Sequence, residues 1–253
     1  MKKIAIVTGA SSGMGRAFVF QLAEKYPKLE EIWVVARREE QLMHLQKEIS
    51  NVRIRAFPMD LKRDDSFRNL SKVLQKEKPW VGILINGAGI GISGNFAEMS
   101  EEEITGMIDV NCRALTRITF CVLPYMKKGG KIYQFASASA FAPQPGFAVY
   151  AASKAYVLRF SIALRQELKE KGIQVMAVCP GPVKTEFLEK AYEKQNMSGY
   201  KRLIMEDCNR VVSCAMKDGK KGKAVSVCGM TMKLTRWIGR VIPEELLVRF
   251  FKS

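Results

Sequence analysis

A tyrosine and a lysine stand four residues apart in the stretch Tyr150-Ala-Ala-Ser-Lys154, within a segment predicted to be helical. Residues at this spacing share one face of a helix, so the phenol and the ammonium can act together. A free phenol has a pKa of about 10, and a neighbouring ammonium favours the phenolate. The pair therefore predicts proton transfer to or from an oxygen, with Tyr150 as the acid/base and Lys154 lowering its pKa.

A glycine-rich turn, Thr8-Gly9-Ala10-Ser11-Ser12-Gly13-Met14-Gly15, follows the first apolar run and precedes a predicted helix. Glycines permit close approach of a backbone, and a helix N-terminus attracts the pyrophosphate of a dinucleotide. The spacing is G-x-x-x-G-x-G rather than G-x-G-x-x-G, and the alternative is an ordinary strand-to-helix turn. The predicted binding residues are Gly9, Ser11, Ser12, Gly13, Met14 and Gly15.

The end of the second predicted strand indicates which dinucleotide binds. An acidic residue there holds the ribose hydroxyls of NAD, whereas arginine accommodates the 2′-phosphate of NADP. This chain reads Val35-Ala36-Arg37-Arg38, with no carboxylate before Glu39. Because arginine forms charge-assisted hydrogen bonds with phosphate, we predict that Arg37 and Arg38 select NADP(H). The alternative is that both arginines only end a surface strand.

Together with Asp60-Leu61 and Asn86-Gly87-Ala88-Gly89, these motifs resemble the short-chain dehydrogenase/reductase family from residue 3 to about residue 187. The resemblance implies an NADP-dependent oxidoreductase that transfers hydride between the cofactor and a carbonyl or secondary alcohol. It implies that Asp60 contacts adenine, that the segment at 86–89 supports the sheet and lines the cofactor, and that Thr185 bonds the carboxamide. Gly87 departs from the family's usual Asn. The cofactor residues implied are Asp60, Leu61, Asn86, Ala88, Gly89, Tyr150, Lys154, Pro180, Gly181, Val183 and Thr185.

The resemblance also implies two further catalytic positions. Ser137 precedes Tyr150 by thirteen residues, which is the family's spacing for the catalytic serine. A hydroxyl there can bond the reacting oxygen and fix its position. Ser139 is the competing candidate, but it requires a different loop shape. Asn111 occupies the family's fourth position, where the residue interrupts a helix and holds a water that links Lys154 to solvent.

Short apolar runs alternate with longer amphipathic stretches as far as about residue 230. The predicted strands span residues 4–7, 32–36, 52–57, 81–85, 132–135, 173–179 and 224–227, and the predicted helices span 14–26, 39–50, 64–78, 101–126 and 150–171. Strands without polar alternation are buried on both faces. We predict an α/β fold: a single Rossmann-like doubly wound domain over residues 1–229, with a seven-stranded parallel sheet covered by helices on both faces.

The composition indicates a globular protein of high positive charge, with a net charge of +16. Such a charge attracts anions, including a phosphorylated cofactor, a CoA thioester or an acidic lipid surface. No basic and aromatic pattern typical of nucleic-acid binding occurs, so nucleic acid is not an expected partner. Six scattered cysteines and the single His44 give no metal site or catalytic triad. With no leader-like or membrane-spanning run, we expect a cytoplasmic protein.

The predicted pocket walls are apolar, which favours a hydrophobic alcohol or ketone. A hydroxysteroid or bile acid needs a flat apolar slot, whereas a 3-oxoacyl thioester needs basic residues such as Lys184, Lys190 or Lys201 for its carrier. A non-catalytic NADPH sensor or scaffold is a more remote alternative. The expected walls are residues 90–96, 139–147 and 185–203, with Ile92, Phe96, Phe141, Phe147, Phe187, Leu188 and Tyr192.

Two segments depart from the strand–helix alternation. Residues 182–203 are predicted to be a helical insertion beside the substrate, and residues 230–253 to be an amphipathic, basic extension. The extension's apolar face, with Leu234, Trp237 and Ile238, is expected to cover the pocket or a subunit contact, or else to touch a membrane. Surplus apolar residues on the helices at 101–126 and 150–171 predict a homodimer or homotetramer.

Overall fold

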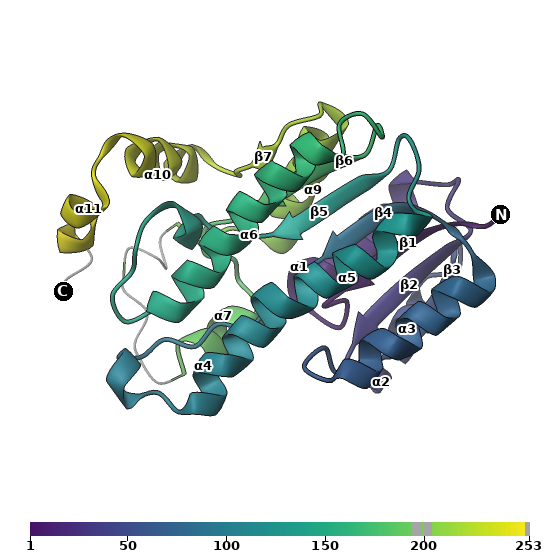
Figure 1. Ribbon diagram of the computed structural model, residues 1–253, viewed down its shortest axis with the longest axis horizontal. Helices are drawn as coiled ribbons and strands as arrows, with labels where there is room; N and C mark the ends of the chain where they lie inside the picture. Colours follow the sequence, from purple (N-terminus) through teal and green to yellow (C-terminus); the bar gives the residue numbers. More distant parts are fainter. Residues whose placement is uncertain (194–198, 200–203, 251–253) are drawn as a thin grey trace.

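The computed structural model describes residues 1–193, 199 and 204–250 (Figure 1). Within these residues, seven strands form one parallel sheet in the order β3-β2-β1-β4-β5-β6-β7. The predicted doubly wound architecture is therefore confirmed. The strands are β1 (Lys3–Thr8), β2 (Glu31–Ala36), β3 (Arg53–Pro58), β4 (Trp80–Asn86), β5 (Lys131–Phe135), β6 (Gln174–Val178) and β7 (Val225–Ser226).

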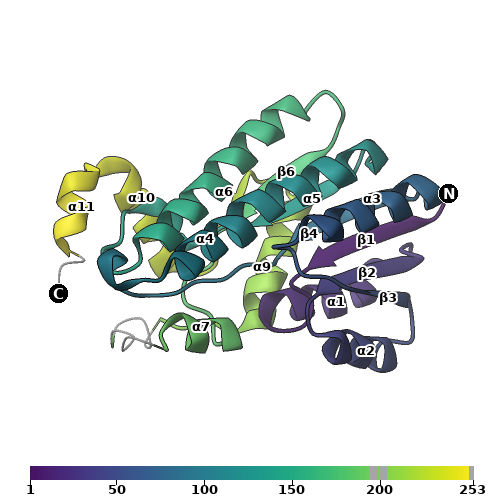
Figure 2. The same cartoon turned by 60° about the horizontal axis from the view of Figure 1, so that its bottom comes forward.

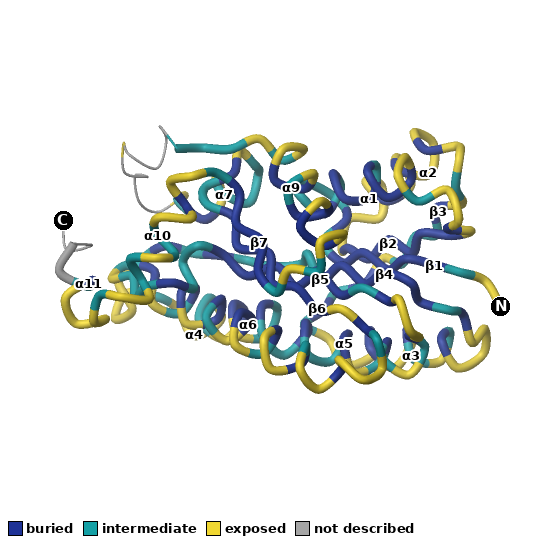
Figure 3. The backbone as a smooth tube through the Cα atoms, turned by 90° about the horizontal axis from the view of Figure 1, so that it is seen from above, coloured by how far each residue is buried: buried dark blue, intermediate teal, exposed yellow. Residues whose placement is uncertain are grey.

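Helices cover both faces of this sheet (Figure 3). Alternate strand residues point to opposite faces, so Ala5 and Val7 join one core whereas Ile4 and Ile6 join the other. The helices are α1 (Gly13–Lys25), α2 (Glu39–Glu48), α3 (Asp64–Glu77), α4 (Glu101–Ile108), α5 (Leu115–Val122), α6 (Ala148–Glu167), α7 (Glu186–Ala191), α9 (Cys208–Lys220), α10 (Met230–Val241) and α11 (Glu244–Phe250). The first core includes side chains of α1, α2 and α9, and the second includes those of α3, α5 and α6.

The strand order reverses between β1 and β4, which is where a doubly wound sheet forms its ligand crevice. The loops that follow these two strands meet there. The backbone N–H groups of Gly87 and Ala88 donate hydrogen bonds to Thr8 Oγ1 at 3.1 and 3.2 Å. Gly9 has a φ of +70°, and a Cβ atom on it would lie 2.6 Å from the carbonyl oxygen of Gly87. Glycine thus lets the two loops close the crevice floor.

The single helix predicted over residues 101–126 is divided. A π-helix, Asp109–Ala114, separates α4 from α5, and a 3₁₀ turn, Leu123–Tyr125, follows α5. The N-terminus of α4 is fixed by a capping box in which Ser100 and Glu103 exchange hydrogen bonds. A π-helical turn such as Asp109–Ala114 inserts one extra residue into the helical hydrogen-bond pattern and often marks a functional site. Here it carries Asn111.

The C-terminal residues leave the sheet after β7. Figures 1 and 2 show α10 and α11 at the end of the molecule away from the N-terminus. The predicted insertion is helical at α7, whereas residues 194–198 and 200–203, including Lys201, lie outside the described residues. Across the described part of the chain, we find no helix whose length and apolar character would let it cross a membrane.

Candidate active site

The glycine turn and the N-terminus of α1 form one end of a cavity of about 960 Å³. A Cβ atom on Gly15 would lie 2.1 Å from the carbonyl oxygen of Gly9, so no larger residue fits there. The backbone of this turn therefore lies directly at the cavity, beside the N-terminus of α1. A helix N-terminus at this place can bind the pyrophosphate of a dinucleotide. All the residues predicted in this turn line the cavity: Gly9, Ser11, Ser12, Gly13, Met14 and Gly15.

Arg37 and Arg38 also line the cavity, at the end of β2. Arg37 is exposed. Arg38 donates to Ser11 Oγ at 3.2 Å and to both carboxylate oxygens of Glu186 at 2.9 Å. These contacts connect the glycine turn to α7. Arg37, Arg38 and Ser11 thus line the end of the cavity where the 2′-phosphate is predicted, together with the Glu186 carboxylate that pairs with Arg38.

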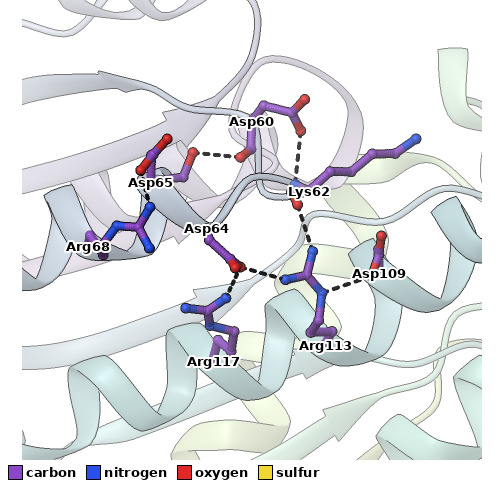
Figure 4. Close-up of polar contacts among 9 residues, drawn as sticks. Asp60, Lys62, Asp64, Asp65, Arg68, Asp109, Arg113 and Arg117 are labelled. Carbon is purple, nitrogen blue, oxygen red and sulfur yellow. Dashed lines mark hydrogen bonds and ion pairs between the residues drawn. The ribbon is translucent and has the colours of Figure 1, made fainter.

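The loop after β3 is tied to the π-helix by a network of charged groups (Figure 4). Arg113 donates to Asp109 and Asp64 at 2.8 Å each and to the carbonyl oxygen of Lys62 at 2.6 Å. Arg117 also bonds Asp64, and these two guanidinium groups lower the pKa of that carboxyl. The network holds Asp60 and Leu61 at the cavity wall, where the adenine is expected.

Asn86 does not line the cavity, contrary to the prediction that it binds the cofactor. It is buried, and its Nδ2 donates to Thr119 Oγ1 at 2.9 Å and to Gln134 Oε1 at 2.8 Å. An amide that bridges a strand and a helix in this way supports the sheet. Ala88 and Gly89 do face the cavity, and Gly87 joins them. The contacts of Asn86 thus support the sheet, and the part of the motif that lines the cavity begins one residue later, at Gly87.

Ser137 and Tyr150 meet in the middle of the cavity. Ser137 follows β5 and Tyr150 lies in the first turn of α6, and the Ser137 hydroxyl is near enough to Tyr150 to favour the phenolate by hydrogen bonding. Ser137 Oγ also accepts the backbone N–H of Ser139 at 3.1 Å, which orients the hydroxyl. Ser139 thus supports the Ser137 hydroxyl through its backbone. The geometry favours Ser137 over Ser139 as the partner of Tyr150.

Burial shifts the pKa values of Tyr150 and Lys154 in opposite directions. Burial raises the pKa of Tyr150 to about 12, and the Ser137 hydrogen bond opposes this only in part. Burial also lowers the pKa of Lys154 to about 8, although its Nζ donates to the Phe135 carbonyl oxygen at 2.9 Å. In the protein alone, desolvation therefore dominates the pKa of Tyr150. The lowering of this pKa by Lys154 stays a prediction for the enzyme with its positively charged nicotinamide bound.

Asn111 is fully buried beneath the catalytic residues. Its Oδ1 accepts the backbone N–H of Ile90 at 2.9 Å, and its Nδ2 donates to the Ile90 carbonyl oxygen and to Ser153 Oγ at 2.8 and 2.9 Å. A Cβ atom on Gly89 would lie 3.2 Å from both Asn111 Oδ1 and Lys154 Nζ. Asn111 thus joins the π-helix, the loop after β4 and α6 beside Lys154.

Aromatic rings surround Tyr150 on the substrate side. The ring centroids of Phe147 and Phe187 lie 4.4 and 5.9 Å from that of Tyr150, and Tyr192 lies 5.7 Å from Phe147. Two expected wall residues do not line the cavity: Phe96 is exposed, and Phe141 packs in a core beneath α10. The expected wall residues that do line it are Ile92, Phe147, Phe187, Leu188 and Tyr192.

The C-terminal extension contributes to this wall, as one of the expected alternatives had it, but with other residues than those predicted. Thr231, Met232 and Thr235 line the cavity, whereas the predicted apolar face with Leu234 and Trp237 is exposed. The nicotinamide-side loop lies next to α10, because a Cβ atom on Gly181 would lie 2.6 Å from Met232 Sδ. Pro180, Gly181, Val183 and Thr185 line the cavity as expected.

Comparison with known proteins identifies the family. The sequence model of the short chain dehydrogenase family matches residues 3–196. A sulfoacetaldehyde reductase of Chromohalobacter salexigens is 33% identical over 192 residues, which cover 74% of this chain and 75% of that protein. The chain therefore belongs to the short-chain dehydrogenase/reductase family, and it is an oxidoreductase of alcohols and carbonyls that uses a nicotinamide cofactor.

Solved structures agree in fold. A short-chain dehydrogenase of Sphingobium yanoikuyae, in complex with NADPH, superimposes with a TM-score of 0.79 at 28% identity, covering 95% of this chain and 93% of that chain. A family member of Burkholderia phymatum, in complex with NAD, superimposes with a TM-score of 0.80 at 18% identity, covering 94% and 92%. The second likeness shows the fold alone.

The residues in place fit a nicotinamide dinucleotide, which supplies or accepts hydride when bound. Burial keeps Tyr150 protonated near neutral pH, so its hydroxyl can give a proton to a carbonyl oxygen. The Lys154 Nζ lies 5.6 Å from the Tyr150 ring centroid, where its positive charge stabilises the phenolate that remains. The Ser137 hydroxyl could donate a hydrogen bond to the same oxygen and hold it beside Tyr150.

Proposed function

We propose that the protein is an NADPH-dependent reductase of a carbonyl on a hydrophobic substrate, with Asn111, Ser137, Tyr150 and Lys154 as its catalytic group. One observation carries the proposal. A single cavity joins Arg37 and Arg38 at one end to Ser137 and Tyr150, surrounded by aromatic rings, at the other. The arginines favour a phosphorylated ribose, and the rings favour an apolar substrate.

Among apolar ketones, the oxo form of a hydroxysteroid or bile acid fits best, and its reduction would give the hydroxy compound. The wall beside Tyr150 is made of Phe147, Phe187 and Tyr192, whose rings can hold a flat, rigid molecule. A 3-oxoacyl thioester is the second candidate, and the described basic residues favour it less. Lys184 does not line the cavity, and Lys190, which does, shares the Glu186 carboxylate with Arg38 at 2.9 Å.

Turnover measurements test both parts of this proposal. NADPH and NADH are each offered with a panel of steroid ketones and 3-oxoacyl thioesters, and cofactor oxidation is followed by absorbance. We expect faster turnover with NADPH and with a steroid ketone. Faster turnover of the thioesters would select the second candidate. Tight NADPH binding without turnover of any ketone would point instead to the non-catalytic sensor.

We also propose that the enzyme is a cytoplasmic homodimer or homotetramer that pairs through α5 and α6. The residues predicted for such a contact are Ile118, Phe120, Val157, Leu158 and Phe160. Ile118, Val157 and Leu158 are buried within the chain itself, and Phe160 is half-buried. Phe120 and Ile162 are exposed, Phe120 to 78%, and they support a contact of this kind. Light scattering at micromolar concentration is expected to give at least twice the chain mass of 28.5 kDa, and a monomer would reject the pairing.

A further inference from the structure

The helix α10 is held against the catalytic part of the molecule by one of its faces. Met232 on this face is 7% exposed, and Thr231, Met232 and Thr235 line the cavity. A Cβ atom on Gly239 would lie 2.2 Å from the Phe141 carbonyl oxygen, so the helix backbone rests directly on the 3₁₀ turn Ala138–Phe141 that follows Ser137. The position of α10 is thus fixed by close packing.

The opposite face of α10 is apolar and exposed. Met230, Leu234, Trp237 and Val241 recur at intervals of four, three and four residues, which places them in one line along a helix. Their exposed fractions are 78, 55, 61 and 59%. We call these four residues the α10 stripe. Figures 2 and 3 show the helix at the end of the molecule, and most of its residues are exposed.

The charges beside the stripe indicate what covers it. Lys233 and Arg240 are exposed and lie along one edge of the stripe, Arg236 lies beyond them, and α10 contains no acidic residue. A two-fold contact between two copies of α10 would bring these positive charges together, which is unfavourable. On an anionic lipid surface, the stripe can be buried at the boundary between headgroups and acyl chains, and the negative headgroups attract Lys233 and Arg240.

We propose that α10 docks the enzyme on anionic phospholipid surfaces, with the α10 stripe inserted at the headgroup boundary. Trp237 lies near the centre of the stripe, and tryptophan favours the boundary between headgroups and acyl chains. Because the other face of the same helix lines the cavity, docking brings the substrate side of the cavity to the membrane surface. The advantage of this arrangement for an apolar substrate rests on the proposed function, whereas docking itself does not.

Vesicle sedimentation of the full-length protein tests the docking. The probes are vesicles of phosphatidylcholine alone and vesicles with about 30% phosphatidylserine, in low salt and in about 0.5 M NaCl. We expect binding to the phosphatidylserine vesicles at least tenfold tighter than to phosphatidylcholine alone, with loss of that difference in high salt. Equal or absent binding to the two vesicle types would overturn the proposal.

Two double variants separate the apolar and the charged contribution. Leu234→Gln with Trp237→Gln is expected to abolish sedimentation, and Lys233→Gln with Arg240→Gln to weaken it about fivefold for each charge removed. The matched controls are Met43→Gln on α2 and Lys72→Gln with Lys76→Gln on α3, which leave binding unchanged. If a control weakens binding as much as its partner variant, α10 is not the docking element.

The same variants distinguish a lipid surface from a second copy of the chain. Light scattering without vesicles is expected to give the same mass for the wild type and for the stripe variant. A stripe variant that dissociates the oligomer and still binds phosphatidylserine vesicles would assign the stripe to a subunit contact and overturn the proposal. Turnover of a water-soluble ketone by each variant confirms folding, so failure to dock and failure of the proposed reaction remain distinguishable.

Discussion

The cofactor side and the substrate side of the cavity are built in different ways. On the cofactor side backbone meets backbone, because an added Cβ on Gly15 would lie 2.1 Å from the Gly9 carbonyl oxygen. On the substrate side a Cβ on Gly91 would instead meet side chains, Phe187 at 2.9 Å and Tyr150 at 3.0 Å. Backbone contacts leave little freedom for change, whereas side chains can be exchanged. The backbone of the fold therefore constrains how the cofactor binds. Selectivity for the substrate depends on a few side chains that can be replaced.

The largest expected effect is on the substrate side, where the Tyr150 hydroxyl carries the proton that is transferred to the substrate. Tyr150→Phe keeps the ring between Phe147 and Phe187 but removes the hydroxyl. We expect turnover to fall by about 10²–10⁴, with NADPH affinity close to normal, because positioned proton transfer contributes that much. Steady-state kinetics and a fluorescence titration with NADPH measure the two quantities.

Tyr156→Phe is the matched control for this variant. Tyr156 lies on the same helix, but it is 43% exposed and its hydroxyl bonds Thr116 Oγ1 at 2.8 Å. Removing this hydroxyl should leave turnover unchanged. The acid/base role would be refuted if Tyr150→Phe kept more than about a tenth of the wild-type rate.

Arg37→Asp tests the one place where the cofactor side depends on side-chain charge. An aspartate would repel the 2′-phosphate and accept hydrogen bonds from free ribose hydroxyls. Losing a charge-assisted phosphate contact costs about 1.5–3 kcal/mol, so the preference for NADPH should shrink by roughly ten- to hundredfold. The ratio of kcat/KM for the two cofactors measures it, and an unchanged ratio would show that Arg37 does not select the cofactor.

Gly15→Ala tests the backbone contact itself. The added methyl would meet the Gly9 carbonyl oxygen and force the turn apart, which costs about 1–3 kcal/mol of stability when a core is overpacked. We expect a lower Tm and weaker NADPH binding together. Gly94→Ala is the control, because its Cβ would meet only Met99 Cγ at an ordinary 3.6 Å. Equal behaviour of the two variants would contradict the contrast between the two sides.

This contrast also explains what the sequence could predict. The glycine turn, the seven-stranded parallel sheet and the meeting of Ser137 with Tyr150 follow from local patterns and a family spacing, and the structure has them where they were expected. The motif at 86–89 does not say which of its residues faces the cavity, and the structure places Asn86 within the sheet and Gly87, Ala88 and Gly89 at the cavity wall. The sequence left open whether the face of α10 with Trp237 covers the pocket, a subunit contact or a membrane, because the helix has apolar residues on both sides. Packing of Met232 against Gly181 and of Gly239 against Phe141 excludes the first of these.

The smallest expected effect is a pH dependence that originates at Lys154. Burial lowers the pKa of Lys154 to about 8 and raises that of Tyr150 to about 12, so between these values Tyr150 keeps its proton while Lys154 loses its charge. Proton donation by Tyr150 leaves a phenolate, which the Lys154 ammonium stabilises below pH 8 and no longer stabilises above it. In the reductive direction, kcat/KM for NADPH should therefore fall as the pH rises through about 8, by at most about tenfold per pH unit, because one proton is lost.

A profile of kcat/KM for NADPH between pH 6 and 10 measures this effect, since that ratio reports groups of the free enzyme. The matched variant is Lys154→Ala, which should be slower throughout and lack the inflection near pH 8. A decline that persists in Lys154→Ala would assign the titration to another group. A wild-type profile that stays flat up to pH 10 would mean that the Lys154 charge contributes nothing to the proton transfer, and that burial of Tyr150 alone determines its acidity.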